Sequence, residues 1–243
     1  MSASGVVRRL ARSNLGRSFV AAAAIADPPL ALGAAGWALQ QRASFAAVTD
    51  WPAELAGFED LAFLFSSNQA NHGVAQLSFV EAALLYRLAG SVSGPVVEIG
   101  RYKGGGTLVL AAGLGEGVDL WSYDTQEKAG SDIDAGIARA LDRYGLAPRV
   151  HLAVGSSHEV ELPAPELGLV FLDGDPTYAG TRADVERWGS ALRCGGHLLL
   201  HDATPGAPRY PAIGKLVTEL AGDARWERAG DVDSLVHFIR IVS

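Results

Sequence analysis

Polar side chains close five short apolar runs in the part of the sequence that follows Gly94. They are Glu98, Asp124, Ser156–Ser157, Asp173 and His201–Asp202. Such groups can hold a proton, a divalent cation or the hydroxyls of a sugar. One of them alone would indicate only a turn or a helix cap, because Asp and Ser favour those positions. Polar residues that follow an apolar run at five separate places predict a ligand-binding cleft.

The stretch VVEIGRYKGGGT, from Val96 to Thr107, joins one of these carboxylates to four glycines, so a ligand could come close to the backbone. A phosphate-binding P-loop needs a lysine after its last glycine, and counting from Gly100 this place is taken by Gly106. A dinucleotide-binding loop needs Gly-x-Gly-x-x-Gly, whereas three residues separate Gly100 from Gly104. Neither phosphate-binding loop fits well.

From Gly94 onward, short apolar runs alternate with helix-length segments, which predicts an α/β fold with a doubly wound, mostly parallel sheet of seven strands. The predicted strands are Pro95–Gly100, Asp119–Asp124, Arg149–Gly155, Leu167–Asp173, Gly196–Asp202, Arg225–Ala229 and Ser234–Ile241. The predicted helices between them are Gly105–Ala112, Ile133–Tyr144, Gly180–Arg193 and Ala212–Ala221. The short turn Gly230–Asp233 should make the last two strands an antiparallel hairpin. Ligands of such sheets bind at the carboxyl ends of the strands.

Residues 1–93 are predicted to form a helical N-terminal extension, ahead of a sheet domain at residues 94–243. Within the extension, Leu77–Gly90 has the pattern of an amphipathic helix. The apolar run FVAAAAIA follows four arginines but has only eight residues, far short of the roughly 20 that cross a bilayer. We expect an ordinary helix there and no transmembrane segment, with attachment to a membrane surface or a partner as the alternative.

Overall composition narrows the functional class. A formal charge of −7, without a cluster of basic and aromatic residues, argues against a nucleic-acid partner. Hydrophobic residues make up 49% of the chain, enough to fill a core. The single cysteine, Cys194, excludes an internal disulfide and a cysteine-based zinc site. A chain with so few cysteines fits a reducing compartment, so we expect a cytoplasmic protein.

The segment EIGRYKGGGT resembles the first motif of class I S-adenosylmethionine-dependent methyltransferases. Its Gly-x-Tyr-x-Gly form is that of catechol O-methyltransferase-like enzymes and of bacterial enzymes that methylate sugars and natural products. The resemblance covers about residues 96–201. It implies that Gly100, Tyr102 and Gly104 contact the methyl donor, S-adenosylmethionine. It also implies that Glu98 accepts bonds from the donor's ammonium group, and the donor needs no phosphate-binding lysine.

Two further segments carry the same resemblance. LWSYD is similar to the second motif, which implies that Asp124 binds the two ribose hydroxyls of the donor. VGSSHE is similar to the third motif, which implies that Ser157 and His158 lie beside the adenine. Capping of a following helix is the alternative for these two residues. Asp173, at the end of the fourth predicted strand, is expected at the donor site as well.

The segments FLDGDPTY and LLLHDAT would complete the methyl-transfer site. In the metal-dependent branch of the family, carboxylates after the fourth and fifth strands hold a magnesium-type ion. The resemblance therefore implies Asp173, Asp202 and His201 as ligands of Mg²⁺ or another divalent cation, which would lower the pKa of the acceptor hydroxyl. The sequence departs from the pattern at Ala203, where catechol-type enzymes have Asn, and at His201, where sugar-modifying relatives have a carboxylate.

The general base also departs from the family pattern. Pro176 stands where related enzymes have a histidine or a lysine, and proline carries no group that transfers a proton. His201 is the nearest replacement and Asp175 the next. His72 is a third candidate if the N-terminal extension covers the cleft.

The sequence thus predicts a methyltransferase that methylates a hydroxyl of a small-molecule acceptor, such as a sugar or a secondary metabolite, with or without a divalent cation. One alternative is a metal-independent N- or O-methyltransferase. Another is a non-catalytic S-adenosylmethionine-binding partner protein, because Pro176 and Ala203 remove expected groups. The N-terminal helices are expected to cap the acceptor site or to form a homo-oligomer contact.

Overall fold

The computed structural model describes residues 45, 48, 51–65, 74–126, 131–204 and 211–242. The chain divides into two compact units, one of residues 1–51 and 63–74 and the other of residues 52–62 and 75–243. In the first unit the Trp51 ring packs against Phe45 and Phe63, with ring centroids 5.9 and 5.4 Å apart. The second unit contains the sheet. His72 and much of the N-terminal extension lie outside the described residues, and the expected roles of the extension as a cap or a homo-oligomer contact stay predictions.

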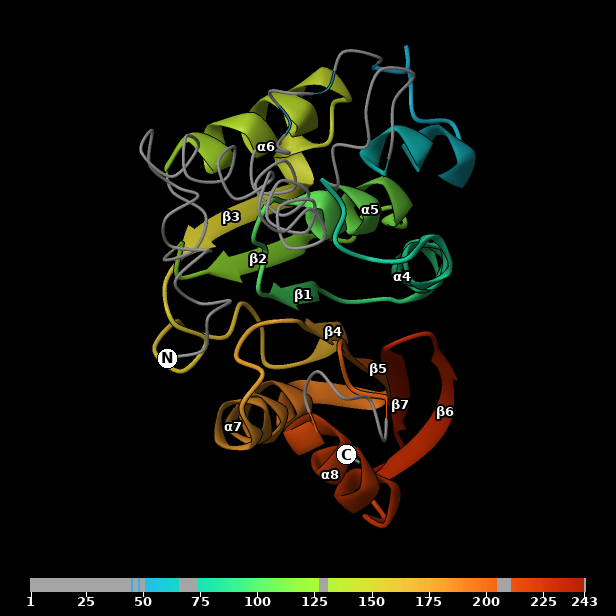
Figure 1. The fold of residues 1–243 in the computed structure, drawn as a ribbon, viewed down its shortest axis with the longest axis vertical. Helices are drawn as coiled ribbons and strands as arrows, with labels where there is room; N and C mark the ends of the chain where they lie inside the picture. The colour runs from blue at the N-terminus through green and yellow to red at the C-terminus, as the bar shows by residue number, and fades with distance from the viewer. Residues whose placement is uncertain are drawn as a thin grey trace, which may run out of the picture. The chain divides into compact units, whose positions relative to one another are not determined.

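Seven strands form one sheet in the order β3-β2-β1-β4-β5-β7-β6 (Figure 1). They are β1 (Val96–Ile99), β2 (Leu120–Asp124), β3 (Val150–Val154), β4 (Leu167–Leu172), β5 (Leu192–Leu200), β6 (Trp226–Val232) and β7 (Leu235–Arg240). Strand β7 is antiparallel to both of its neighbours, and the other pairs are parallel. This confirms the predicted mostly parallel sheet and its terminal hairpin. Strand order reverses between β1 and β4, which places a ligand at their carboxyl ends.

Helices cover both faces of this sheet. The α-helices are α4 (Phe79–Ser91), α5 (Gly105–Gly113), α6 (Ser131–Arg143), α7 (Tyr178–Trp188) and α8 (Pro211–Ala221). Short 3₁₀ helices are η2 (Phe58–Leu64), η3 (Ala147–Arg149) and η4 (Gly189–Ala191). Figure 1 shows α5 and α6 over one face, with α4 beside α5, and α7 and α8 over the other. Within the described residues, no helix has both the length and the apolar character to cross a membrane.

Helix α4 belongs to the sheet-containing unit. It begins with a capping box, in which the Ser78 hydroxyl accepts from the Glu81 N–H and the Glu81 carboxylate accepts from the Ser78 N–H. It then packs along α5. The sequence pattern grouped residues 75–93 with the N-terminal extension, whereas contacts in the structure group them with the sheet.

The core follows the alternation of side chains along the strands. Val97 of β1 joins a hydrophobic cluster with Trp188 of α7 and Val217 of α8. The next residue, Glu98, points to the opposite face, where its carboxylate accepts a hydrogen bond from Thr107 of α5. Because helices cover both faces, β4 is buried at every position. Continuous apolar runs were therefore a reliable indication of strands in this chain.

The helix predicted for Gly180–Arg193 was wrong at its C-terminal end. Helix α7 ends at Trp188, and the chain turns through η4 into β5, which begins at Leu192. Ala191 and Leu192 lie in the same hydrophobic cluster as Trp188, so the apolar pattern continues across the break. The pattern alone could not show where helix changes to strand.

Strand β6 is longer than predicted. It extends beyond Ala229 to Val232, with a register shift between Arg228 and Gly230. The predicted turn of four residues therefore shrinks to Asp233 and Ser234, between Val232 and the start of β7. This places the hairpin turn beside the segment that follows β5, since the Ala203 N–H donates to the Ser234 carbonyl.

Candidate active site

The chain leaves the middle strands of the sheet at one common edge. Four backbone hydrogen bonds show this: Gly155 N–H to Asp124 O (3.0 Å), Gly100 N–H to Tyr123 O (2.9 Å), Asp173 N–H to Ile99 O (2.8 Å) and His201 N–H to Leu172 O (3.0 Å). Each residue that follows a strand is thus tied to the end of the neighbouring strand. The structure therefore brings Asp124, the glycine loop, Asp173 and His201 into one row.

The glycine loop depends on backbone conformations that most residues avoid. Gly100 has a φ of +94°, and a Cβ added to it would lie 2.2 Å from the Asp173 carbonyl oxygen. Tyr102 has a φ of +46°, and Gly104, the N-cap of α5, has a φ of +80°. Glycine adopts this left-handed region without the steric cost of a Cβ. The loop is therefore a rigid, close-packed turn between β1 and α5.

The two cations of the loop point into the protein. The Arg101 guanidinium is 3% exposed and pairs with Asp134 of α6 at 3.1 Å, while also donating to the carbonyls of Ser122 and Ala153. The Lys103 side chain is also buried, and burial lowers its pKa to about 8. Arg101 therefore stabilises the ends of β2 and β3. Both cations are buried, which agrees with a ligand that needs no phosphate-binding charge.

Glu98 lies beneath the loop and is almost fully buried. Its carboxylate accepts hydrogen bonds from the hydroxyls of Thr107, at 2.6 Å, and Ser122. Burial outweighs these two bonds and raises the pKa of Glu98 to about 7. The residue anchors the start of α5 to β1 and β2. Its expected contact with the donor's ammonium group stays a prediction.

Asp124 lies where β2 ends, beside the glycine loop. Its Oδ2 accepts the backbone N–H of Tyr102 at 2.8 Å, and its Oδ1 accepts the N–H of Gln126. A carboxylate offers about four lone-pair directions, so each oxygen keeps the capacity to accept a further bond. The side chain is partly exposed. These features suit a carboxylate that binds a vicinal diol.

The loop after β3 places Ser157 and His158 next to α7. Trp188 Nε1 donates to the Ser157 carbonyl at 3.2 Å, and the Ser157 side chain faces the Asp184 carboxylate, where it opposes the rise that burial causes in the pKa of Asp184. His158 Nδ1 lies 3.7 Å from Asp184 Oδ1. The His158 side chain is 45% exposed, whereas Asp184 is buried. Sequence reasoning did not identify Asp184, which looks like any polar residue of a surface helix.

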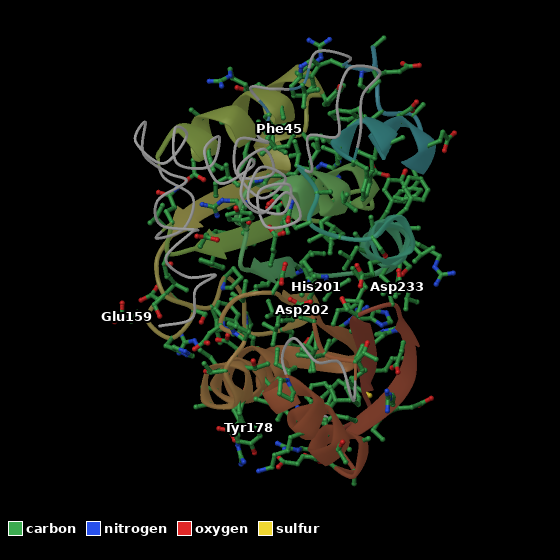
Figure 2. The ribbon with its side chains drawn as sticks, in the orientation of Figure 1. Phe45, Glu159, Tyr178, His201, Asp202 and Asp233 are labelled. Atoms are coloured by element: carbon green, nitrogen blue, oxygen red, sulfur yellow. The ribbon has the colours of Figure 1, made fainter. Side chains whose placement is uncertain are left out.

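At the other end of the row, His201 lies between two carboxylates. Its Nδ1 is 2.9 Å from Asp173 Oδ1, and its Nε2 is 3.5 Å from Glu81 Oε2. Burial alone would lower the pKa of His201, but the two carboxylates outweigh it and raise this pKa to about 10. His201 is therefore a buried cation at neutral pH. Figure 2 shows His201 and Asp202 together.

Glu81 is the second partner that sequence reasoning missed. Its Oε1 accepts the N–H and the hydroxyl of Ser234, at 2.8 and 2.7 Å, in the β6–β7 turn. Burial alone would raise the pKa of Glu81, yet bonds from His201 and Ser234 lower it to about 2. The only sequence signal is the capping box Ser78-x-x-Glu81, which predicts a helix start and gives no indication of a contact 120 residues away.

A divalent cation would fit part of this cluster. Asp173, His201 and Asp202 offer ligand atoms that lie within 4.8 Å of one another. Two carboxylates suit a hard ion such as Mg²⁺, which keeps several waters. Both ring nitrogens of His201 face carboxylates, and its expected roles as a metal ligand and as a general base stay predictions. Asp202 has a φ of +54°, a left-handed conformation that Asp tolerates better than most residues.

Asp175 is engaged locally, in the turn that starts α7. Its side chain accepts the N–H of Thr177 at 2.9 Å and the Thr177 hydroxyl at 3.0 Å. Thr177 in turn caps α7 by accepting from the Gly180 N–H. These bonds are those of a turn-forming aspartate. The expected role of Asp175 as a base stays a prediction.

The segment 97–203 matches the model of a family described as a methyltransferase domain. No curated protein sequence matches the chain. The matched segment begins in β1 and ends just after His201–Asp202, so it contains every strand end of the row and stops before the β6–β7 hairpin.

Solved structures share the fold. An O-methyltransferase from Bacillus cereus in complex with SAH is 17% identical, with a TM-score of 0.52 over 75% of this chain and 88% of that one. The O-methyltransferase NovP is 15% identical, with a TM-score of 0.54 over 84% and 97%. CalS11, a TDP-rhamnose 3′-O-methyltransferase, is 20% identical, with a TM-score of 0.52 over 66% and 77%. Residues 97–203 therefore match a methyltransferase domain, and the chain shares the fold of these O-methyltransferases.

Proposed function

We propose that the protein transfers the methyl group of S-adenosylmethionine to a hydroxyl of a small molecule, and that the acceptor is a sugar or a secondary metabolite. The observation that carries this proposal is the single row formed by Asp124, the glycine loop and the Asp173–His201–Asp202 cluster. A diol-binding carboxylate and a carboxylate cluster share that edge. Among structures with this fold, CalS11 acts on TDP-rhamnose, which supports a sugar as one acceptor class.

The donor would lie across the ends of β1, β2 and β3. In this arrangement Asp124 accepts the two ribose hydroxyls, and Gly100, Tyr102 and Gly104 bring the loop backbone against the aminoacyl part. Ser157 and His158 meet the adenine. The loop is held by Arg101 and Glu98 from below, so little ordering is needed when the donor binds.

Methyl transfer is an in-line displacement. The acceptor oxygen attacks the methyl carbon, the carbon–sulfur bond breaks, and S-adenosylhomocysteine leaves as a neutral thioether. The hydroxyl proton must also leave, and a carboxylate of the cluster, Asp173 or Asp202, would accept it. A divalent cation held by these two side chains would lower the pKa of the hydroxyl. The buried positive charge of His201 keeps Asp173 in place.

Calorimetric titration with S-adenosylmethionine and S-adenosylhomocysteine, with and without Mg²⁺, tests the proposal. We expect micromolar binding of both, followed by turnover on nucleotide sugars or phenols. The variant Asp202→Ala should keep donor binding and lose any turnover that depends on Mg²⁺. Full activity of this variant would exclude the metal site. Absence of donor binding under every condition would exclude the function.

A metal-independent reaction is the second candidate. It is favoured by one observation: both ring nitrogens of His201 face carboxylates, so the cluster offers a divalent ion only two side-chain ligands. Turnover after treatment with EDTA separates the two candidates. Unchanged activity favours the metal-independent reaction, and recovery only on addition of Mg²⁺ favours the metal-assisted one.

A further inference from the structure

Helix α7 supports the loop after β3 with two buried side chains one turn apart. Trp188, which is fully buried, donates from Nε1 to the Ser157 carbonyl at 3.2 Å. Asp184 is 2% exposed, and its carboxylate faces the Ser157 side chain and lies 3.7 Å from His158 Nδ1. The spacing of four residues places both on one face of the helix. Both therefore reach the loop that carries Ser157 and His158.

One oxygen of the Asp184 carboxylate has room for a further hydrogen bond. Asp184 Oδ1 is buried and has no hydrogen-bond partner among the described residues. His158 Nδ1 lies 3.7 Å from this oxygen. Burial raises the pKa of Asp184 because a desolvated carboxylate is unfavourable. A small rotation of His158 would bring its N–H within hydrogen-bonding distance and satisfy this oxygen.

We propose that Asp184 is a positioning residue for recognition of the donor's adenine, acting through His158. This rests on the proposed function, in which His158 lies beside the adenine. A neutral imidazole has one donor nitrogen and one acceptor nitrogen. When Asp184 accepts the Nδ1–H, Nε2 becomes the acceptor. The half-exposed ring can then accept a hydrogen bond from the exocyclic amine of adenine through Nε2.

This arrangement predicts selectivity at position 6 of the purine. Adenine carries an amine there, which donates, whereas hypoxanthine carries a carbonyl, which accepts. An Nε2 acceptor favours the amine and opposes the carbonyl. Bonds of this kind are often long before a ligand binds and shorten in the complex, so we expect the 3.7 Å separation to shorten when the donor binds.

The test compares two ligands in each variant. Calorimetry at pH 8, above the usual histidine range, gives dissociation constants for S-adenosyl-homocysteine and for its deaminated analogue, S-inosyl-homocysteine. The variants are Asp184→Ala, His158→Ala, the double substitution and the control Glu186→Ala, an exposed carboxylate on the same helix. The wild type should prefer the adenine ligand by about tenfold, the value of one hydrogen bond.

Asp184→Ala should bring this preference close to one, and the control should leave it at about tenfold. In the His158→Ala background, Asp184→Ala should cause no further change, because the two residues act as one unit. The preference is a ratio within one variant, so partial unfolding cancels. An unchanged preference in Asp184→Ala, or an additional loss in the double variant, overturns the proposal. Binding of neither ligand by the wild type would instead overturn the proposed function itself.

Discussion

The two halves of the candidate site are built in different ways. On the donor side, the loop from Gly100 to Gly104 is fixed by positive φ angles and by buried groups within Glu98–Asp134, a continuous stretch of the chain. On the acceptor side, His201 is fixed by ion pairs with Glu81 and Asp173, and Glu81 is also bound by Ser234. Those residues come from four distant parts of the sequence.

The two halves of the site should therefore tolerate amino-acid substitutions to different degrees. A loop defined by backbone conformation tolerates almost no added side-chain atoms, because a Cβ would clash whatever its chemistry. A site defined by ion pairs between side chains can be altered one residue at a time, since the sheet beneath it is untouched. We expect the donor side to be inflexible and the acceptor side to be adaptable, which suits one donor and varied acceptors.

The largest effect is expected for Gly100→Ala. The new Cβ would lie 2.2 Å from the Asp173 carbonyl oxygen, at a φ of +94°. We expect the free energy of unfolding to fall by about 3 kcal/mol or more, the range of strained backbone combined with overpacking. Binding of S-adenosylhomocysteine should be lost. Urea unfolding and calorimetry measure the two effects.

Gly117→Ala is the matched control for this substitution. Gly117 has a φ of +71°, but a Cβ there would meet nothing within 4 Å. Only the strain of the left-handed conformation applies, about 1 kcal/mol. Equal losses of stability in the two variants would show that the contact between the loop and the end of β4 is unimportant.

The second largest effect is expected on the acceptor side, for Glu81→Gln. Glu81→Gln leaves a buried His201 cation with one carboxylate partner in place of two, which should lower the free energy of unfolding by roughly 3 kcal/mol. Donor binding should be unchanged within about twofold, because Glu81 belongs to the other half of the site. The control Glu219→Gln removes a surface ion pair with Lys215 and should cost no more than about 1 kcal/mol.

The same variant has a predicted pH dependence. The pKa of His201 is raised to about 10 from an ordinary 6.5, so its contribution to stability is complete below pH 6.5 and disappears as pH rises through 10. The pKa of Glu81 is lowered to about 2, so its contribution holds above pH 4.5 and disappears as pH falls through 2. Glu81→Gln should therefore flatten the decline between pH 6.5 and 10. An unchanged slope, measured by urea unfolding across this range, would contradict the ion pair.

This contrast also explains what the sequence could predict. The strands β1 to β4 were located to within about one residue at each end, because each is a continuous apolar run buried on both faces. The residues at the strand ends could be placed in one row, because parallel strands end at the same edge. The glycine loop could be recognised, because its left-handed backbone conformation requires glycine at Gly100 and Gly104 and these residues are visible in the sequence.

Contacts between distant residues could not be predicted. Glu81 has the sequence pattern of a helix cap, and nothing near it indicates that its second oxygen meets Ser234. His201 was considered as a base and as a metal ligand, but its protonation depends on that same carboxylate. Asp184 likewise depends on how α7 packs against the loop after β3. In each case the chemistry of a side chain is set by a tertiary neighbour.

A moderate effect on the donor side is expected for Asp124→Ala. The substitution removes the carboxylate proposed to bind the ribose hydroxyls and also releases the Tyr102 N–H. Calorimetry should show donor binding weakened by about 1–3 kcal/mol, the range for hydrogen bonds to a charged group. Asp119→Ala, ahead of the other end of β2, removes an exposed carboxylate paired with His151 and is the control. Unchanged donor affinity in Asp124→Ala would remove this residue from the site.

The smallest effect is expected for Asp175→Asn, which distinguishes a turn-forming aspartate from a base. Asparagine can still accept the Thr177 N–H through its amide oxygen, so the start of α7 should be kept. If the structural bonds are the whole role of Asp175, methyl transfer at saturating donor and acceptor should stay within about twofold of the wild type. An amide cannot take a proton, so a loss of 10²-fold or more, the usual contribution of a general base, with unchanged stability would instead make Asp175 the base. The acceptor side would then depend on the loop after β4 as well as on the ion pairs of His201.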